Sequence, residues 1–172
     1  MAMTISGDGS ITGLTAGGLP DATITQSDLA SPIYSKGTPT YSAYGSGATT
    51  LSNNTFTKIL FATEDWDTNN NFASSTFTPT IAGYYQINAT ISLSSVSNQE
   101  ILISIYKNGS EHKRAGDIVT TTGLQVSVSS LVYCNGSTDY IDIYGYQNSG
   151  VSKTTATNAW QTWTNGFLAR GA

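Results

Sequence analysis

The clearest pattern along the chain is a strict alternation of apolar and polar residues from Tyr85 to Leu93. Period two places every apolar side chain on one face of an extended chain, so this segment predicts a half-buried antiparallel strand of about 10 residues. Gly83 marks a turn just before it. Further β-forming segments separated by turn residues surround it, at residues 39–44, 56–61, 101–109, 123–133, 139–146 and 163–169. Together they predict an all-β domain.

Four motifs in this series resemble the C1q-like branch of the C1q/TNF jelly rolls. They are TYSA around Tyr41, FTPTIAGYY at residues 77–85, YKNG at residues 106–109 and GFL at residues 166–168. The sequence departs from the family at Trp163, where Phe is usual, and at Asn165, which looks inserted before the terminal glycine. The resemblance implies an antiparallel jelly-roll β-sandwich head over residues 39–172.

Residues 1–38 form a segment of a different kind, rich in Gly, Ser, Thr and turn-forming pairs and too poor in apolar residues to fold alone. Composition by itself is also typical of a flexible linker. The run at residues 9–24, GSITGLTAGGLPDATI, resembles the stretches that precede C-terminal heads in bacteriophage tail fibres and related virion proteins. That resemblance implies a short stalk wound from three identical copies.

Charge and composition narrow the function. Only 10% of the residues are charged and the net charge is −4, so the chain lacks the basic surface that nucleic acid requires. We expect no secretory signal, because the N-terminus has neither a basic nor an apolar region, and no membrane insertion, because no apolar run approaches 18 residues. A location in a virion, or a fragment of a longer protein, fits an exposed protein of this kind.

Candidate chemistry is sparse. His112 is the only histidine and lies in a charged segment without a neighbouring nucleophile, and Cys134, the only cysteine, ends an apolar strand as a core residue would. Acidic residues at positions 64, 65, 67, 139 and 142 leave a calcium site open, as some C1q-like heads hold calcium near their axis. No D-x-D-x-D-G loop is present, however, so we expect neither a metal nor a cofactor.

The implied topology places the candidate sites. It puts the first strand, the last strand, the Gly83 strand and the Tyr140 strand side by side in one sheet, and we expect Trp163 in the core. Tyr140, Tyr144 and Tyr146 share one strand face and alternate with apolar residues on the other, which favours core or subunit interface over a ligand role. The loops at 45–54, 94–100, 134–138 and 156–161 are predicted to form a distal rim. Its candidate ligand-binding residues are Asn98, Gln99, Asn135, Asn158 and Trp160.

The resemblance further implies a homotrimer whose axis is lined by Gln86, Asn88, Thr90 and Thr164. The resulting hypothesis is a non-enzymatic trimeric adhesion head of a phage tail fibre or similar virion appendage, which binds a host cell-surface receptor, glycan or protein, and meets other virion proteins through its stalk. One alternative is a structural trimerisation tip or capsid decoration protein without its own ligand. Another is a depolymerase, which is disfavoured because no carboxylate pair can be assigned to a cleft.

Overall fold

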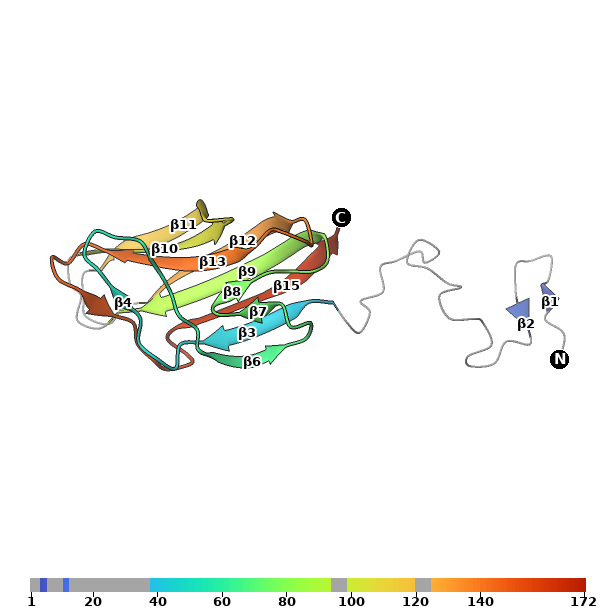
Figure 1. Cartoon of the computed structure of the whole chain (residues 1–172), viewed down its shortest axis with the longest axis horizontal. Helices are drawn as coiled ribbons and strands as arrows, with labels where there is room; N and C mark the ends of the chain where they lie inside the picture. The colour runs from blue at the N-terminus through green and yellow to red at the C-terminus, as the bar shows by residue number, and fades with distance from the viewer. Residues whose placement is uncertain (1–3, 6–10, 13–37, 94–98, 120–124) are drawn as a thin grey trace. The chain divides into compact units, whose positions relative to one another are not determined.

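The computed structural model describes residues 4–5, 11–12, 38–93, 99–119 and 125–172. In these residues every regular element is a β-strand. The chain divides into two units, Met1–Lys36 and Gly37–Ala172. Within the first unit, β1 (Thr4–Ile5) pairs with β2 (Ile11–Thr12) in an antiparallel register. The second unit is a sandwich of two antiparallel sheets (Figure 1).

One sheet of the sandwich has five strands in the order β12-β9-β15-β3-β6. These strands are β3 (Thr40–Tyr44), β6 (Thr63–Asp67), β9 (Gly83–Ser92), β12 (Gln125–Cys134) and β15 (Trp163–Gly171). The alternation predicted in β9 is confirmed, because Tyr85, Ile87, Ala89 and Ile91 are fully buried while Gln86 and Asn88 are not. This sheet therefore has one core-facing side and one outward side, here called the outer face.

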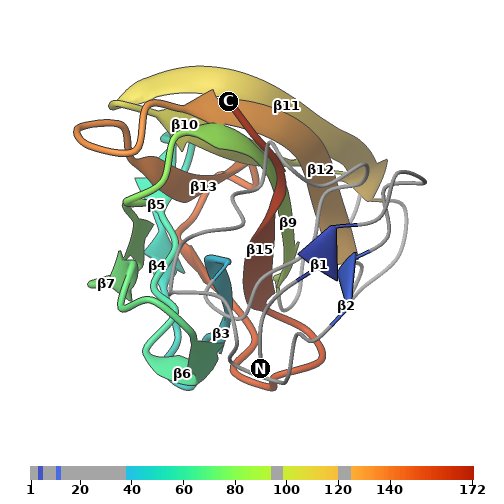
Figure 2. The ribbon, with the colours of Figure 1, turned by 90° about the vertical axis from the view of Figure 1, so that its right-hand side faces the viewer.

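The other sheet follows the order β11-β10-β13-β8-β7, with β5 also paired to β13. Its strands are β5 (Thr57–Lys58), β7 (Phe72–Ala73), β8 (Thr76–Phe77), β10 (Gln99–Lys107), β11 (Ser110–Val119) and β13 (Ile141–Gln147). A separate pair joins β4 (Thr50–Leu51) to β14 (Lys153–Thr154). The arrangement is the predicted jelly-roll β-sandwich, and Figure 2 shows the two curved layers end-on.

Aromatic rings fill the core between the two sheets. Tyr41 stacks on Phe72 and Phe77 with ring centroids 4.7 and 4.5 Å apart, and Phe77 meets the edge of Tyr85. Burial of these rings contributes both apolar area and specific ring geometry. The buried hydroxyl of Tyr41 shares a 3.1 Å hydrogen bond with Thr164 Oγ1, which meets the requirement that a buried phenol find a partner.

The position predicted for the Tyr140 strand is wrong. Its strand, β13, lies in the six-stranded sheet, and β12 occupies the place beside β9. The physical reason is matched patterning: β12 and β9 pair over ten residues, with Val126, Val128 and Val132 on the same side as the buried residues of β9. The outward positions of Ser127 and Ser129, which alternate with the valines of β12, suit a strand with one buried face.

Strand directions define two ends of the sandwich. The base is the end at which Gly83 lies between Cys134 and Gly171, and the rim is the opposite end. β3 and β9 run from base to rim, whereas β12 and β15 return from rim to base. The loop at residues 134–138 therefore lies at the base, so its predicted place on the rim, and that of Asn135, is wrong. The error follows from the misplaced strand β13.

Candidate functional site

Trp160 is the most exposed large apolar side chain among the described residues, with 68% of its surface accessible. Its loop precedes β15 and is closed by backbone bonds from Gln161 and Thr162 to the Asn158 carbonyl. Asn158 Nδ2 donates to Gln161 Oε1 at 2.6 Å, and Gln125 Nε2 donates to the Trp160 carbonyl at 2.8 Å. The backbone of the loop is thus fixed while the indole projects into solvent, so Trp160 does not cap the core.

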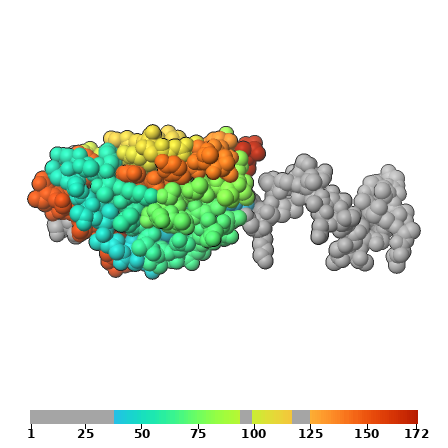
Figure 3. Space-filling view, in the orientation of Figure 1, coloured from blue at the N-terminus to red at the C-terminus, as the bar shows by residue number. Residues whose placement is uncertain are grey.

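Neighbouring rim segments are tied to this loop. The Gly45 amide donates to the Thr162 carbonyl at 2.9 Å, and the Thr155 amide donates to the Thr49 carbonyl at the same distance. The Thr49 amide in turn donates to Thr155 Oγ1, and the Ala156 amide to the Ser92 carbonyl. The loops after β3 and before β15 consequently form one cross-linked surface at the left-hand end of Figure 3.

The residues predicted to bind a ligand do not all meet there. Asn158 and Trp160 share one loop, and Gln99 begins β10 at the rim end, whereas Asn98 lies outside the described residues. Asn135 sits at the base, where its Oδ1 accepts the amides of Ser137, Thr138 and Asp139. An asparagine that satisfies three backbone donors has a structural role in its turn.

The outer face of the five-stranded sheet carries a polar band at mid-height. Gln86 and Asn88 point outward here, as predicted, and Thr90 lies on the same side of β9 but is buried. Gln86 Nε2 donates to Ser129 Oγ at 2.8 Å, Asn88 Nδ2 donates to Asn165 Oδ1 at 2.9 Å, and Thr90 shares a 2.7 Å bond with Ser127. The band is therefore a cross-strand network of amides and hydroxyls.

Thr164 does not belong to this face, so its predicted place on the axis is wrong. It pairs with Ala89, is fully buried and bonds Tyr41. Asn165, which looked like an insertion, is a regular strand residue opposite Asn88, and it takes the outward position. The same register turns Trp163 outward beside Thr90, where it is half-buried, so the expectation of a core tryptophan is also wrong.

Sequence reasoning missed an apolar patch at the base of the outer face. Its members each leave between 42 and 55% of their surface accessible: Tyr84, Leu131, Tyr133 and Phe167. The rings of Tyr84 and Tyr133 lie 5.4 Å apart. The alternation could have revealed the patch, because Tyr84 and Phe167 fall on the outward parity of their strands.

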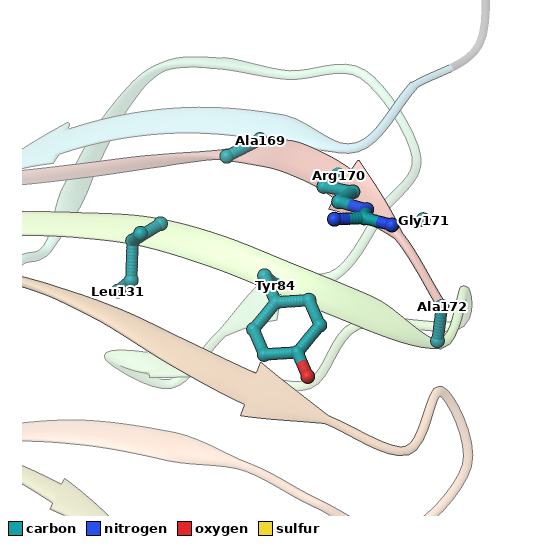
Figure 4. Close-up of a pocket in the computed structure, with 6 residues that line it drawn as sticks. All are labelled: Tyr84, Leu131, Ala169, Arg170, Gly171 and Ala172. Carbon is teal, nitrogen blue, oxygen red and sulfur yellow. The ribbon is translucent and has the colours of Figure 1, made fainter.

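An open groove of about 710 Å³ adjoins this patch. It is lined by Tyr84, Leu131, Ala169, Arg170, Gly171 and Ala172. Figure 4 shows the Tyr84 ring between Leu131 on one side and the last residues of the chain on the other. Apolar walls beside one guanidinium make a surface suited to an apolar group with an acidic neighbour.

The outer face of the six-stranded sheet carries a second aromatic cluster. Tyr106 stacks on Tyr144 at 4.1 Å, Phe56 packs against Tyr106 and Tyr146, and Arg114 lies over the Phe56 ring. Tyr140, Tyr144 and Tyr146 are only partly buried, in contrast to the buried isoleucines of β13, which confirms the predicted division of faces. These rings pack against one another and form a small apolar cluster outside the main core.

Burial shifts the pKa values of the cysteine and the histidine singled out from the sequence. Burial raises the pKa of the Cys134 thiol to about 11 and lowers the pKa of His112. No group of three or more His, Cys, Asp or Glu residues in the described ranges is placed to hold a metal ion. Nor does this part contain a helix long and apolar enough to cross a membrane.

No protein-family model and no curated protein matches the sequence. Solved structures do match its fold. The globular domain of zebrafish complement 1qA is 14% identical and covers 78% of this chain and 99% of its own, with a TM-score of 0.58. Eiger TNF from S. frugiperda is 6% identical over 78% of this chain and 95% of its own, with a TM-score of 0.63. PRD1 vertex protein P5 is 16% identical over 77% and 98%, with a TM-score of 0.58. The domain therefore has a C1q/TNF-like jelly-roll fold.

Proposed function

We propose that this protein is the non-enzymatic, homotrimeric adhesion head of a phage tail fibre or similar virion appendage, and that its rim binds a host cell-surface receptor. The observation that carries the proposal is Trp160, an indole held out from a fixed loop at the end of the sandwich opposite the C-terminus. Exposed tryptophan is costly for solubility, and a rigid aromatic side chain is a frequent anchor in recognition surfaces.

The rim chemistry favours a glycan over an apolar ligand. Trp160 offers a flat apolar face, and the amides of Asn158 and Gln161 stand in the same loop. Sugars present apolar ring faces edged by hydroxyls, which such a pairing of indole and amide groups complements. Gln99 and Asn98 extend the proposed site, and a protein receptor with a polar surface is the other candidate ligand.

The outer face supports the trimeric state. The patch made by Tyr84, Leu131, Tyr133 and Phe167 is exposed apolar surface of the kind that often marks an interaction site. Three copies arranged around an axis would cover this patch and bring together the polar bands that contain Asn88. Weak binding by each rim would then be raised by multivalency within a fibre.

A virion location is supported by the likeness to PRD1 vertex protein P5 and by the resemblance of residues 9–24 to stretches that precede tail-fibre heads. In this proposal residues 1–38 form the stalk and connect the head, residues 39–172, to other virion proteins. The head then carries no catalytic residue and works by adhesion.

The test is adsorption of the purified protein to host cells. Trp160→Ala removes the indole without touching the core, and loss of such an anchor costs about 2 kcal/mol, roughly thirtyfold in affinity. Ile81→Ala is the control, because Ile81 is an exposed apolar residue at the base, away from the rim. We expect only the Trp160 variant to lose binding while both variants keep the parent's mass and melting temperature.

A structural trimerisation tip or decoration protein is the second candidate. It is favoured by the self-pairing of the rim amides, since the Asn158 and Gln161 side chains already bond each other. Undiminished adsorption by a folded Trp160→Ala protein, or no adsorption by the parent, would support this role and remove the receptor-binding proposal. Cleavage of host polysaccharide by the purified protein would contradict both.

A further inference from the structure

A pocket opens on the side of the sandwich where both sheets end in short strands. The strand β6 is the last of the five-stranded sheet there, β7 is the last of the six-stranded sheet, and Figure 2 shows the two along the same side of the sandwich. The pocket, here called the side pocket, has a volume of about 350 Å³ and is lined by parts of residues 60–64 and of the β7–β8 hairpin. A volume of this size accommodates one side chain or a small ligand.

Glu64 gives the side pocket an unpaired negative charge. It pairs with the buried Ala43 across the strands, so its side chain is on the core-facing side of the edge strand β6. The floor of the pocket is apolar, because Phe61 and Phe72, which line it, are buried. No described residue forms an ion pair or a side-chain hydrogen bond with the Glu64 carboxylate. A carboxylate beside an apolar floor is complementary to a cationic ligand with an apolar part.

The walls of the side pocket are held in place by hydrogen bonds of the protein itself. The Phe61 amide donates to Ser75 Oγ at 2.8 Å, which ties the segment at residues 60–64 to the β7–β8 hairpin. The Leu60 amide donates to Thr49 Oγ1 at 2.9 Å. The pocket is therefore preformed, which lowers the entropic cost of binding a ligand.

The turn between β7 and β8 places a free hydroxyl in the same pocket. Its two residues, Ser74 and Ser75, are left-handed with φ of 51° and 60°, in a tight turn of the kind that usually takes Asn or Gly. Ser75 bonds the Phe61 backbone, whereas Ser74 is exposed, lines the pocket and has no side-chain hydrogen bond to a described residue. Left-handed residues other than glycine are concentrated at functional sites. The Ser74 hydroxyl adds an oxygen acceptor to the pocket.

We propose that the side pocket binds the ammonium group of a lysine side chain on a partner protein. In this site Glu64 pairs with the ammonium and Ser74 accepts a hydrogen bond from it. The aliphatic stem lies on Phe72 and on Leu60, which leaves 50% of its surface accessible. The apolar floor favours lysine over an amino sugar, because the sugar carries its amino group on a polar ring. The site is separate from the rim and does not depend on the proposed trimer.

Methyl NMR of Leu60 tests the proposal on the intact protein. We expect Nα-acetyl-lysine methylamide to shift the Leu60 methyl signals saturably, with a dissociation constant of about 1 to 10 mM for a ligand of this size. Nα-acetyl-norleucine methylamide has a similar stem without the ammonium. It should bind at least about tenfold more weakly, because it cannot pair with Glu64.

Two substitutions on β6 remove the same charge from neighbouring residues. Glu64→Gln should weaken binding of the lysine compound by about tenfold or more and keep the parent's melting temperature, since no described group pairs with this carboxylate. Asp65→Asn is the matched control. The Asp65 carboxylate accepts the Ser42 hydroxyl at 2.8 Å and does not line the pocket, so this variant should bind the lysine compound as the parent does.

The outcomes are distinct from those of the adsorption test. An absent shift at Leu60, or equal affinity for the norleucine compound, would overturn the proposal. Equal weakening by the two substitutions would also overturn it, since general surface charge would then attract the ligand. Unchanged binding by Glu64→Gln would mean that the carboxylate only protects the edge of β6 from pairing with other strands. Glucosamine that binds as tightly as the lysine compound would exclude the lysine side chain as the specific occupant.

Discussion

We expect Cys134 to be unreactive in the folded protein because of its surroundings. The side chain is fully buried beside the core aromatics, and desolvation raises the thiol pKa to about 11. Because the thiolate is the reactive form, native protein at pH 8 should resist iodoacetamide, and unfolded protein should be alkylated completely. Mass spectrometry of the two samples checks this. Rapid labelling of the native protein would contradict the burial of the strand end that Cys134 forms.

Gly83 is required by close approach of another strand. A Cβ at this position would lie 2.5 Å from the Arg170 carbonyl oxygen and 2.6 Å from Leu168 Cδ1. We expect Gly83→Val to lower the free energy of unfolding by about 1 to 3 kcal/mol. Gly47 is the control, since a Cβ there meets nothing within 4 Å and valine should change stability by less than about 0.5 kcal/mol. Equal denaturation midpoints for the two variants would show that the β9–β15 register is misplaced.

At the scale of elements, Asp139 ties three segments together at the base. Its carboxylate accepts Asn108 Nδ2 at 2.7 Å, the Asn135 amide at 2.9 Å and Lys107 Nζ at 2.9 Å. The bond from Asn108, followed by that from Lys107, lowers the carboxyl pKa below its ordinary value of 3.8. A lowered folded-state pKa stabilises the fold above the ordinary value, and this contribution is lost as pH falls through the folded-state value.

Asp139→Asn should therefore be less stable than the parent at pH 7, by about 1 to 3 kcal/mol, because a charged acceptor is replaced by a neutral one with a misplaced donor. The deficit should shrink as pH falls below about 4, because the unfolded parent then binds a proton at Asp139 and the folded parent does so at a lower pH. Chemical denaturation at pH 7 and pH 3 measures both values. A deficit that is the same at the two pH values would mean that charge at Asp139 contributes nothing.

The sequence predicts where individual strands lie better than it predicts which strands pair with one another. The alternation in β9 fixes which residues face the core, because period two admits only one arrangement when one face is buried. Which strand pairs with β9 depends on long-range matching between β9 and β12, and no local signal carries that information. Because β13 was expected in the wrong sheet, the loop that precedes it, which contains Asn135, was predicted at the rim and lies at the base.

The candidate sites differ in the same way: exposure in a loop could be predicted locally, whereas the face of a strand residue depends on register. Trp160 could be recognised as an exposed loop residue because its neighbours are polar, whereas Thr164 was assigned to the wrong face by a single-residue shift at Asn165. The apolar patch at Tyr84 and Leu131 was missed because its members come from different strands. Alternation shows that Tyr84 and Phe167 face outward, and the strand register is needed in addition to show that they form one surface with Leu131.

At the scale of the whole molecule, the proposed trimer depends on the outer face of the five-stranded sheet. The five-stranded sheet leaves a groove and a patch of four apolar side chains uncovered, and such exposed apolar surface is typical of an interaction site. In the proposed trimer, assembly around an axis would cover these surfaces and leave the rims free at one end. Adhesion through the rim and stability through the outer face are then separate properties, which independent substitutions can remove one at a time.

The most direct measurement is the native mass of the protein by light scattering coupled to size-exclusion chromatography at micromolar concentration. The account predicts a single species at three times the chain mass of 18.1 kDa. A stable species at 18.1 kDa would contradict it, since the outer face would then be exposed in solution.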